Sequence, residues 1–137
     1  MPYWLMKSEP GAWSWEDQVK AGTAEWDGVR SHQASNNLKA MKRGDRAFFY
    51  HSGNEKRIVG IVEVVKEYYP DPADPTGRFG MVDVTALKPL NEPVSLERIK
   101  AAPRLAGLAL VRQPRLSVMP VREAEWRLIC EMGKTTP

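Results

Sequence analysis

Cysteine is almost absent from the sequence, and Cys130 is its single example among 137 residues. No disulfide can form within the chain, and a metal site built from paired cysteines is excluded. Cys130 lies in an apolar helical pattern, so we expect a buried thiol. A lone thiol suits a reducing compartment, and we predict a cytoplasmic location.

Long hydrophobic runs are also absent. No stretch approaches the roughly 18 apolar residues that a membrane-spanning helix needs, and the N-terminus lacks a signal-peptide pattern, so we expect no membrane association. Hydrophobic residues make up 42% of the sequence and charged residues 27%, which excludes a disordered chain. We predict a single domain over residues 1–137.

Catalytic and metal-binding motifs are missing. The two histidines, His32 and His51, do not form an HxH or HExxH pattern, so we predict no metal site. His51 precedes Ser52, but neighbours in a strand point to opposite faces and no GxSxG turn is present. We therefore expect a structural histidine rather than a hydrolase. The spaced glycines of a phosphate loop are absent as well, and we predict no cofactor.

A short helix is predicted after the first aromatic segment. Ser14 followed by Asp17 has the pattern of a capping box. Trp15 and Val19 share one face of the helix that this box would begin, and Gly22 would end the helix.

Helical spacing recurs in three later segments, at residues 32–42, 95–103 and 122–132. Their inward-facing residues are predicted to be Ala34, Leu38 and Met41, then Leu96 and Ile99, then Trp126, Ile129 and Cys130.

Strands are predicted at residues 3–7, 45–52, 57–69, 81–90 and 111–121. Gly60 interrupts a β-branched run too long for a flat hairpin arm, so we expect a bulge that curls the sheet. Pro114 should place its strand at an edge or begin it, and residues 70–77 form a proline-rich loop. The order does not alternate as βαβα, so we predict an α+β domain around a small closed or strongly bent sheet.

Five tryptophans are a large number for a chain of this size. Trp4, Trp15 and Trp126 fit strand or helix faces, and we predict that they belong to the core. Trp26 lies outside any periodic pattern, and we predict that it occupies a turn and faces a ligand. Aromatic and small polar side chains near it could hold a flat heteroaromatic ligand; they are Ser8, Ser31, His32, Tyr50 and Ser52.

Several sequence blocks together resemble the EVE domain family. They are YWLMKSEP at residues 3–10, WDGVR at 26–30, GD with FFYHS at 44–52, GIVEVV at 60–65, YPDP at 69–72 and LVRQPRLSVMPV with EW at 110–126. The blocks keep their order over nearly the whole chain, and we identify the sequence as a member of that family.

The resemblance implies a PUA-like fold, a small mixed β-barrel with surrounding helices that is related to YTH domains. It also implies a non-catalytic reader of modified nucleobases, chiefly modified cytosine in DNA or alternatively a base in RNA, that takes a flipped base into an aromatic and polar pocket. On this basis the pocket would consist of Lys7, Ser8, Trp26, Val29, Arg30, Ser31, His32, Tyr50, His51 and Ser52.

One segment departs from the family pattern. Ser31, His32 and Ser35 stand where many relatives carry asparagine, tyrosine and arginine. The preferred base can therefore differ from theirs, and a phosphate contact is lost at Ser35. Four basic residues could supply backbone contacts instead: Lys42, Arg43, Arg112 and Arg115.

Two alternatives remain open at the level of sequence. One is an enzyme that acts on a modified nucleotide or small heterocycle, with Glu9 or His51 as its general base. The other is an RNA-processing accessory protein whose pocket is vestigial. A reader of this size would be a monomer and would act by occupancy or through effector proteins.

Overall fold

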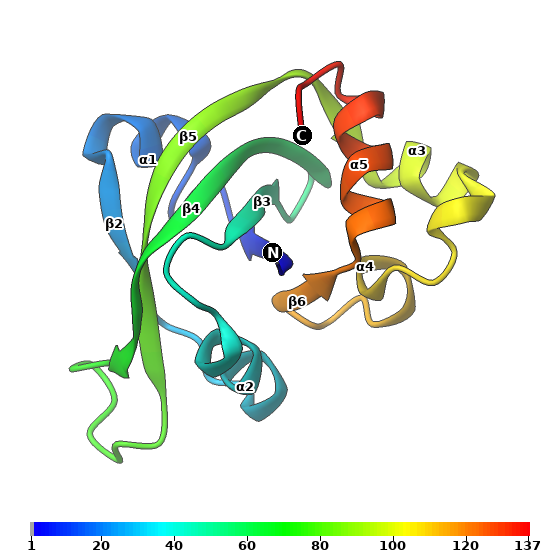
Figure 1. The fold of residues 1–137 in the computed structure, drawn as a ribbon. Coiled ribbons are helices and arrows are strands. Elements are labelled where there is room, and N and C mark those ends of the chain that lie inside the picture. The colour runs from blue at the N-terminus through cyan, green and yellow to red at the C-terminus, as the bar shows by residue number, and fades with distance from the viewer. Residues whose placement is uncertain (1) are drawn as a thin grey trace.

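The computed structural model describes residues 2–137 and has six strands and five α-helices around one strongly bent sheet (Figure 1). The strands are β1 (Tyr3–Ser8), β2 (Thr23–Trp26), β3 (Arg46–His51), β4 (Arg57–Pro70), β5 (Gly80–Ser95) and β6 (Val118–Val121). The helices are α1 (Trp15–Ala21), α2 (His32–Ala40), α3 (Leu96–Ala101), α4 (Ala109–Arg112) and α5 (Glu123–Met132), with a 3₁₀ turn at Pro103–Leu105.

The sheet is mixed and open. Its strand order is β2-β5-β4-β3-β1-β6, so β2 and β6 are its edges. β1 runs parallel to β3, and all other neighbours are antiparallel. Of the two predicted forms, the sheet therefore has the bent one and is not a closed barrel.

The predicted bulge at Gly60 is confirmed. The register between β4 and β5 shifts between Ile58 and Gly60. A Cβ atom at Gly60 would lie 2.6 Å from the ring of Trp15. Glycine therefore lets α1 lie close against the sheet.

The capping box of α1 is confirmed, because the Ser14 side chain accepts from the Asp17 amide and the Asp17 carboxylate accepts from the Ser14 amide. Gly22 caps the other end. On the face that Trp15 and Val19 share, Trp15 is buried but Val19 is 53% exposed. Gln18 takes the inward position, because its Nε2 donates to the Val84 carbonyl of the sheet at 3.3 Å.

The other helices agree with their predicted faces. Ala34, Leu38 and Met41 are buried under α2, and Ile99 is buried under α3. In α5, Trp126, Ile129 and Cys130 are fully buried. Burial raises the pKa of the Cys130 thiol to about 11, which suppresses the reactive thiolate.

The predicted strand at residues 111–121 is wrong in its first half. Residues 109–112 form α4, and the amide of Leu116 donates to the carbonyl of Gln113 across a turn that contains Pro114. Only β6 is extended, and it is an edge strand. The buried side chains of Leu108, Leu110 and Leu116 favour the compact path over an extended one.

Trp4, Trp15 and Trp126 are buried in the core, as predicted. The Trp126 ring stacks on Tyr3 and Phe48, with ring centroids 4.4 and 3.9 Å away. Trp4 donates to the buried carboxylate of Asp45 at 3.0 Å. Within residues 2–137, no helix has the length and apolar character needed to cross a bilayer.

Candidate functional site

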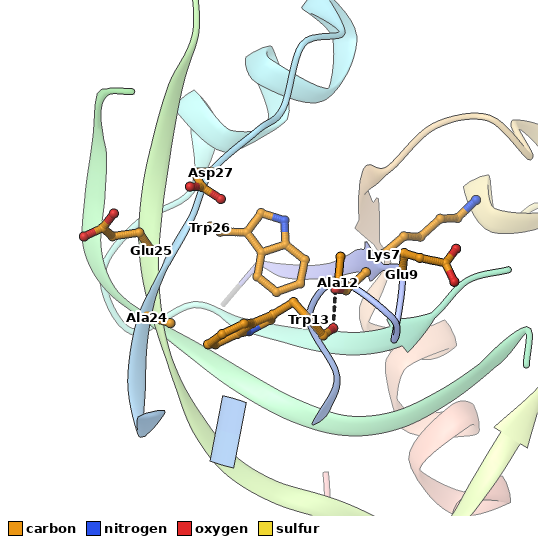
Figure 2. Close-up of a pocket in the computed structure, with 9 residues that line it drawn as sticks. Lys7, Glu9, Ala12, Trp13, Ala24, Glu25, Trp26 and Asp27 are labelled. Carbon is orange, nitrogen blue, oxygen red and sulfur yellow. Dashed lines mark hydrogen bonds between the residues drawn. The ribbon is translucent and has the colours of Figure 1, made fainter. Parts of the chain in front are cut away.

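A cavity of about 590 Å³ opens where β1 ends, beside β2 (Figure 2). Three of its lining residues, Lys7, Ser8 and Trp26, were predicted from the sequence. The full lining is Lys7, Ser8, Glu9, Ala12, Trp13, Ala24, Glu25, Trp26 and Asp27. The cavity therefore combines two indole rings with charged and small polar groups.

Trp26 is the last residue of β2, so its predicted position in a turn is wrong. It pairs with Val82 of β5, is only 8% exposed, and packs edge-on against Phe49 at a centroid distance of 5.4 Å. β2 has four residues, too few for a clear alternating pattern. The core thus fixes one wall of the cavity.

Trp13 provides the second indole ring, and its role was not predicted from the sequence. Its Nε1 donates to Gln18 Oε1 at 2.9 Å, and its carbonyl accepts from Ser8 Oγ at 2.5 Å. Its amide donates to the Glu9 carbonyl at 2.9 Å. Trp13 lies in a non-periodic segment, and such a position was the reason for predicting that Trp26 faces a ligand.

Lys7 connects the cavity to the segment that precedes β6. Its Nζ donates to the Pro114 carbonyl at 2.8 Å and lies 5.7 Å from the centre of the Tyr50 ring. Burial lowers the pKa of Lys7 and raises the pKa of Tyr50. Tyr50 is 3% exposed and does not line the cavity, so it supports Lys7 from behind.

His51 and Ser52 do not line the cavity, but they form hydrogen bonds with the chain beside it. The Ser52 amide donates to the Ser8 carbonyl at 2.9 Å. His51 is buried; its Nε2 accepts from the Trp15 amide at 3.0 Å, and its Nδ1 lies 3.0 Å from Glu55 Oε1. Because an amide can only donate, Nδ1 carries the proton and donates to Glu55. The expected structural role of His51 is confirmed in its geometry.

The four residues that follow WDG do not line the cavity. Val29 is buried in the core, and Ser31 caps α2 by accepting from the Ala34 amide. Arg30 and His32 both lie against Phe79. The Arg30 guanidinium carbon is 5.8 Å from the centre of the Phe79 ring, and the His32 and Phe79 ring centroids are 5.1 Å apart. They form an exposed group beside the loop between β4 and β5.

Asp71 anchors this group. It is buried, and its Oδ2 accepts from the Gly28 amide and from Arg30 Nη1, each at 3.1 Å. Its Oδ1 accepts from the Ala73 amide at 2.9 Å. The hydrogen bond from Gly28 is the largest cause of a lowered Asp71 pKa. Asp71 thereby fixes the chain immediately after Asp27 of the cavity.

The four predicted phosphate contacts separate into two pairs. Arg112 and Arg115 are exposed beside Pro114, the residue that Lys7 contacts. A second cavity, of about 380 Å³, lies there and is lined by Ser31, Gln33, Gln113, Pro114, Arg115 and Leu116. Lys42 and Arg43 precede β3, and the β1–β3 register places them at the end away from Ser8.

Metal ligands are not grouped in the part of the chain that the structure describes, since no three His, Cys, Asp or Glu side chains there could share an ion. The chemistry that the cavity offers is stacking, through Trp13 and Trp26, and hydrogen bonding at its rim.

Known proteins are similar to this chain in both sequence and fold. Mouse thymocyte nuclear protein 1 is 37% identical over 170 aligned residues, which cover 98% of this chain and 75% of the mouse protein. A Rhodopseudomonas palustris protein solved by NMR is 54% identical, with a TM-score of 0.93 and coverage of 98% of this chain and 94% of that one. The structure of human THYN1 in complex with 5-methylcytosine-containing DNA is 34% identical, with a TM-score of 0.91 and full coverage of both chains.

A more distant likeness bears on the fold alone. The YTH domain of Zygosaccharomyces rouxii MRB1, in complex with N6-methyladenosine RNA, has a TM-score of 0.59 at 15% identity and covers 99% of this chain and 88% of that one. The PUA-like α+β fold expected from the sequence is thus confirmed. The sequence model of the EVE domain matches residues 2–132. Since that match spans nearly the whole chain and the relatives agree in fold, the chain belongs to the EVE domain family.

Proposed function

We propose that this protein is a non-catalytic reader that binds a modified nucleobase, most simply a modified cytosine in DNA, in the cavity between β1 and β2. The observation that carries the proposal is the pair of indole rings, Trp13 and Trp26, on the wall of a cavity of about 590 Å³. A base that stacks on an aromatic side chain gains about 1 to 3 kcal/mol. The complex of human THYN1 with 5-methylcytosine DNA supports the ligand class.

The base would enter by flipping out of the helix. Flipping costs a few kcal/mol and is cheapest for a modified, mismatched or single-stranded base. The wall that receives it is preformed, because Trp26 packs on Phe49 and Trp13 is held by Ser8 and Gln18. A preformed site loses little conformational entropy on binding. The nucleic acid could be RNA instead of DNA. We expect the reader to be a monomer and to have effector proteins as partners.

The enzyme alternative fits these contacts poorly. A general base needs a free acceptor within reach of the substrate. Both ring nitrogens of His51 are engaged, one by the Trp15 amide and the other by Glu55. Glu9 lines the cavity and is the remaining candidate base. Incubation with modified nucleosides should give no product with either the wild type or Glu9→Gln, and a product lost in Glu9→Gln would favour the enzyme.

The test is a binding titration that does not depend on protein fluorescence. Labelled oligonucleotides with cytosine, methylcytosine, hydroxymethylcytosine or methyladenine at one position, as DNA and as RNA, are titrated by anisotropy at two salt concentrations. We expect one modified base to bind at least about tenfold more tightly than its parent, a difference of about 1.4 kcal/mol. Equal binding of all oligonucleotides, or no binding, would overturn the proposal.

Variants locate the binding in the cavity. Trp13→Ala should abolish the preference, and Trp13 is the cleaner site because Trp26→Ala also opens a hole in the core against Phe49. Val19→Ala is the matched control, since Val19 is an exposed apolar residue on the helix that follows Trp13. Thermal unfolding of each variant shows whether a loss of binding reflects a loss of structure.

A further inference from the structure

The rim of the cavity is acidic. Three carboxylates line it, those of Glu9, Glu25 and Asp27, against the single ammonium group of Lys7. A phosphate would be repelled here, so the part of a nucleic acid that enters must be a base rather than its backbone.

The donors of the lining are largely engaged by the protein. Ser8 Oγ donates to the Trp13 carbonyl, Trp13 Nε1 to Gln18, and Lys7 Nζ to the Pro114 carbonyl. Glu25 and Asp27 are exposed residues, so their carboxylates are open to accept a hydrogen bond from a ligand. The indole N–H of Trp26 lies in the plane of its ring, so it does not reach a base that stacks on the face of that ring. The cavity thus has free acceptors and few free donors.

Of the three carboxylates, we select Asp27 as the acceptor for a bound base. It follows Trp26 directly in the chain, and it is one of the residues that line the cavity. Glu25 extends away from the rings on the other side of the strand, and Glu9 lies across the cavity beside Lys7. The Gly28 amide is bonded to Asp71, which fixes the backbone next to Asp27.

We propose that the Asp27 carboxylate accepts a hydrogen bond from the exocyclic amino group of the bound base. The cavity would then bind amino bases, of the cytosine and adenine type, more tightly than their oxo counterparts. Carboxylates in proteins accept from the N4 amino group of cytosine, whereas thymine presents an O4 acceptor that a carboxylate repels. The inference rests on the proposed function and adds to it the group by which the base is chosen.

The test compares 5-methylcytosine with thymine, which have the same methyl group and nearly the same shape but differ at the 4-amino or 4-oxo group. Single-stranded oligonucleotides carry either base at one position, so that no cost of unpairing enters. The wild type should prefer 5-methylcytosine by about tenfold or more. Asp27→Asn, whose amide can also donate, should reduce this ratio to within about threefold, because thymine gains a partner and 5-methylcytosine loses a charge-assisted one.

Glu25→Gln is the matched control, because it removes the same charge from the same strand on the side away from the rings. Loss of a negative charge strengthens the binding of every oligonucleotide, so the ratio between the two bases is the readout and not the affinity. The inference is overturned if Asp27→Asn keeps the wild-type ratio, or if Glu25→Gln loses it equally. If the wild type binds no modified base more tightly than its parent, the proposed function itself has failed.

Discussion

The buried ring of His51, at the end of β3, accepts a hydrogen bond from the backbone amide of Trp15, the first residue of α1, at 3.0 Å. The segment between β1 and α1 carries Glu9, Ala12 and Trp13 of the cavity. One side chain of the sheet therefore fixes the end of the segment that supplies three of the nine lining residues of the candidate site.

His51→Phe should destabilise the protein by about 1 to 3 kcal/mol, because the buried amide of Trp15 loses its acceptor while the ring volume is kept. Chemical denaturation measures the change in the free energy of unfolding, and hydrogen exchange at the Trp15 amide shows where it arises. Glu55→Gln is the control, since a glutamine oxygen can still accept from Nδ1. A His51→Phe protein with unchanged stability and a protected Trp15 amide would contradict this account.

Protonation of the Asp71 carboxylate should lower the stability of the protein in acid. Its pKa in the folded protein is lowered from the ordinary value of 3.8, chiefly by the Gly28 amide. The ionised carboxylate therefore contributes stability that is fully present above pH 3.8 and is lost as the pH falls through the lower folded-state value. Asp71→Asn should cost about 1 to 3 kcal/mol at neutral pH and should flatten the acid limb of the stability curve.

The comparison for Asp71 is thermal unfolding of both proteins from neutral pH down to about one pH unit below the ordinary pKa of the carboxyl. An Asp71→Asn protein whose stability falls as steeply as that of the wild type in this range would assign the acid sensitivity to other carboxylates.

The salt dependence of nucleic-acid binding should differ between variants of the two pairs of basic residues. Reversal of both Arg112 and Arg115 to glutamate should weaken binding to all sequences alike and reduce the slope of log K against log salt by about 2, since each phosphate contact contributes about 0.9. Lys42 and Arg43, at the other end of the β1–β3 pair, make a matched double reversal with the same change in charge. Titrations at four or more salt concentrations measure both slopes. An unchanged slope for the first pair removes it from the contact surface.

The sequence predicted the parts of the fold that have a strong local signal. The capping box at Ser14, the bulge at Gly60 and the inward face of α5 are each specified by residues close together in the chain. The strand predicted at residues 111–121 failed because burial of Leu108, Leu110 and Leu116 depends on the rest of the core. The inward position of Gln18 was not predicted for the same reason, since the contact between Gln18 and Val84 joins distant segments.

The candidate site was predicted in part. Lys7, Ser8 and Trp26 line the cavity, whereas the role of the other predicted pocket residues stays a prediction. Arg30 and His32 are near Trp26 in sequence, but the chain turns at Gly28 towards Asp71, and this carries them to Phe79. Trp13 was missed because no motif marks it, and its non-periodic position was the one signal that pointed to it.

All nine residues that line the cavity come from one unbroken stretch, residues 7–27, while most of the sheet that supports it comes from later in the chain. This stretch is tied to the sheet by the pairing of β2 with β5 and by contacts at Phe49, His51 and Gly60. The ligand preference of the protein could therefore diverge during evolution by changes within one short stretch of the chain, while the rest of the sheet is kept.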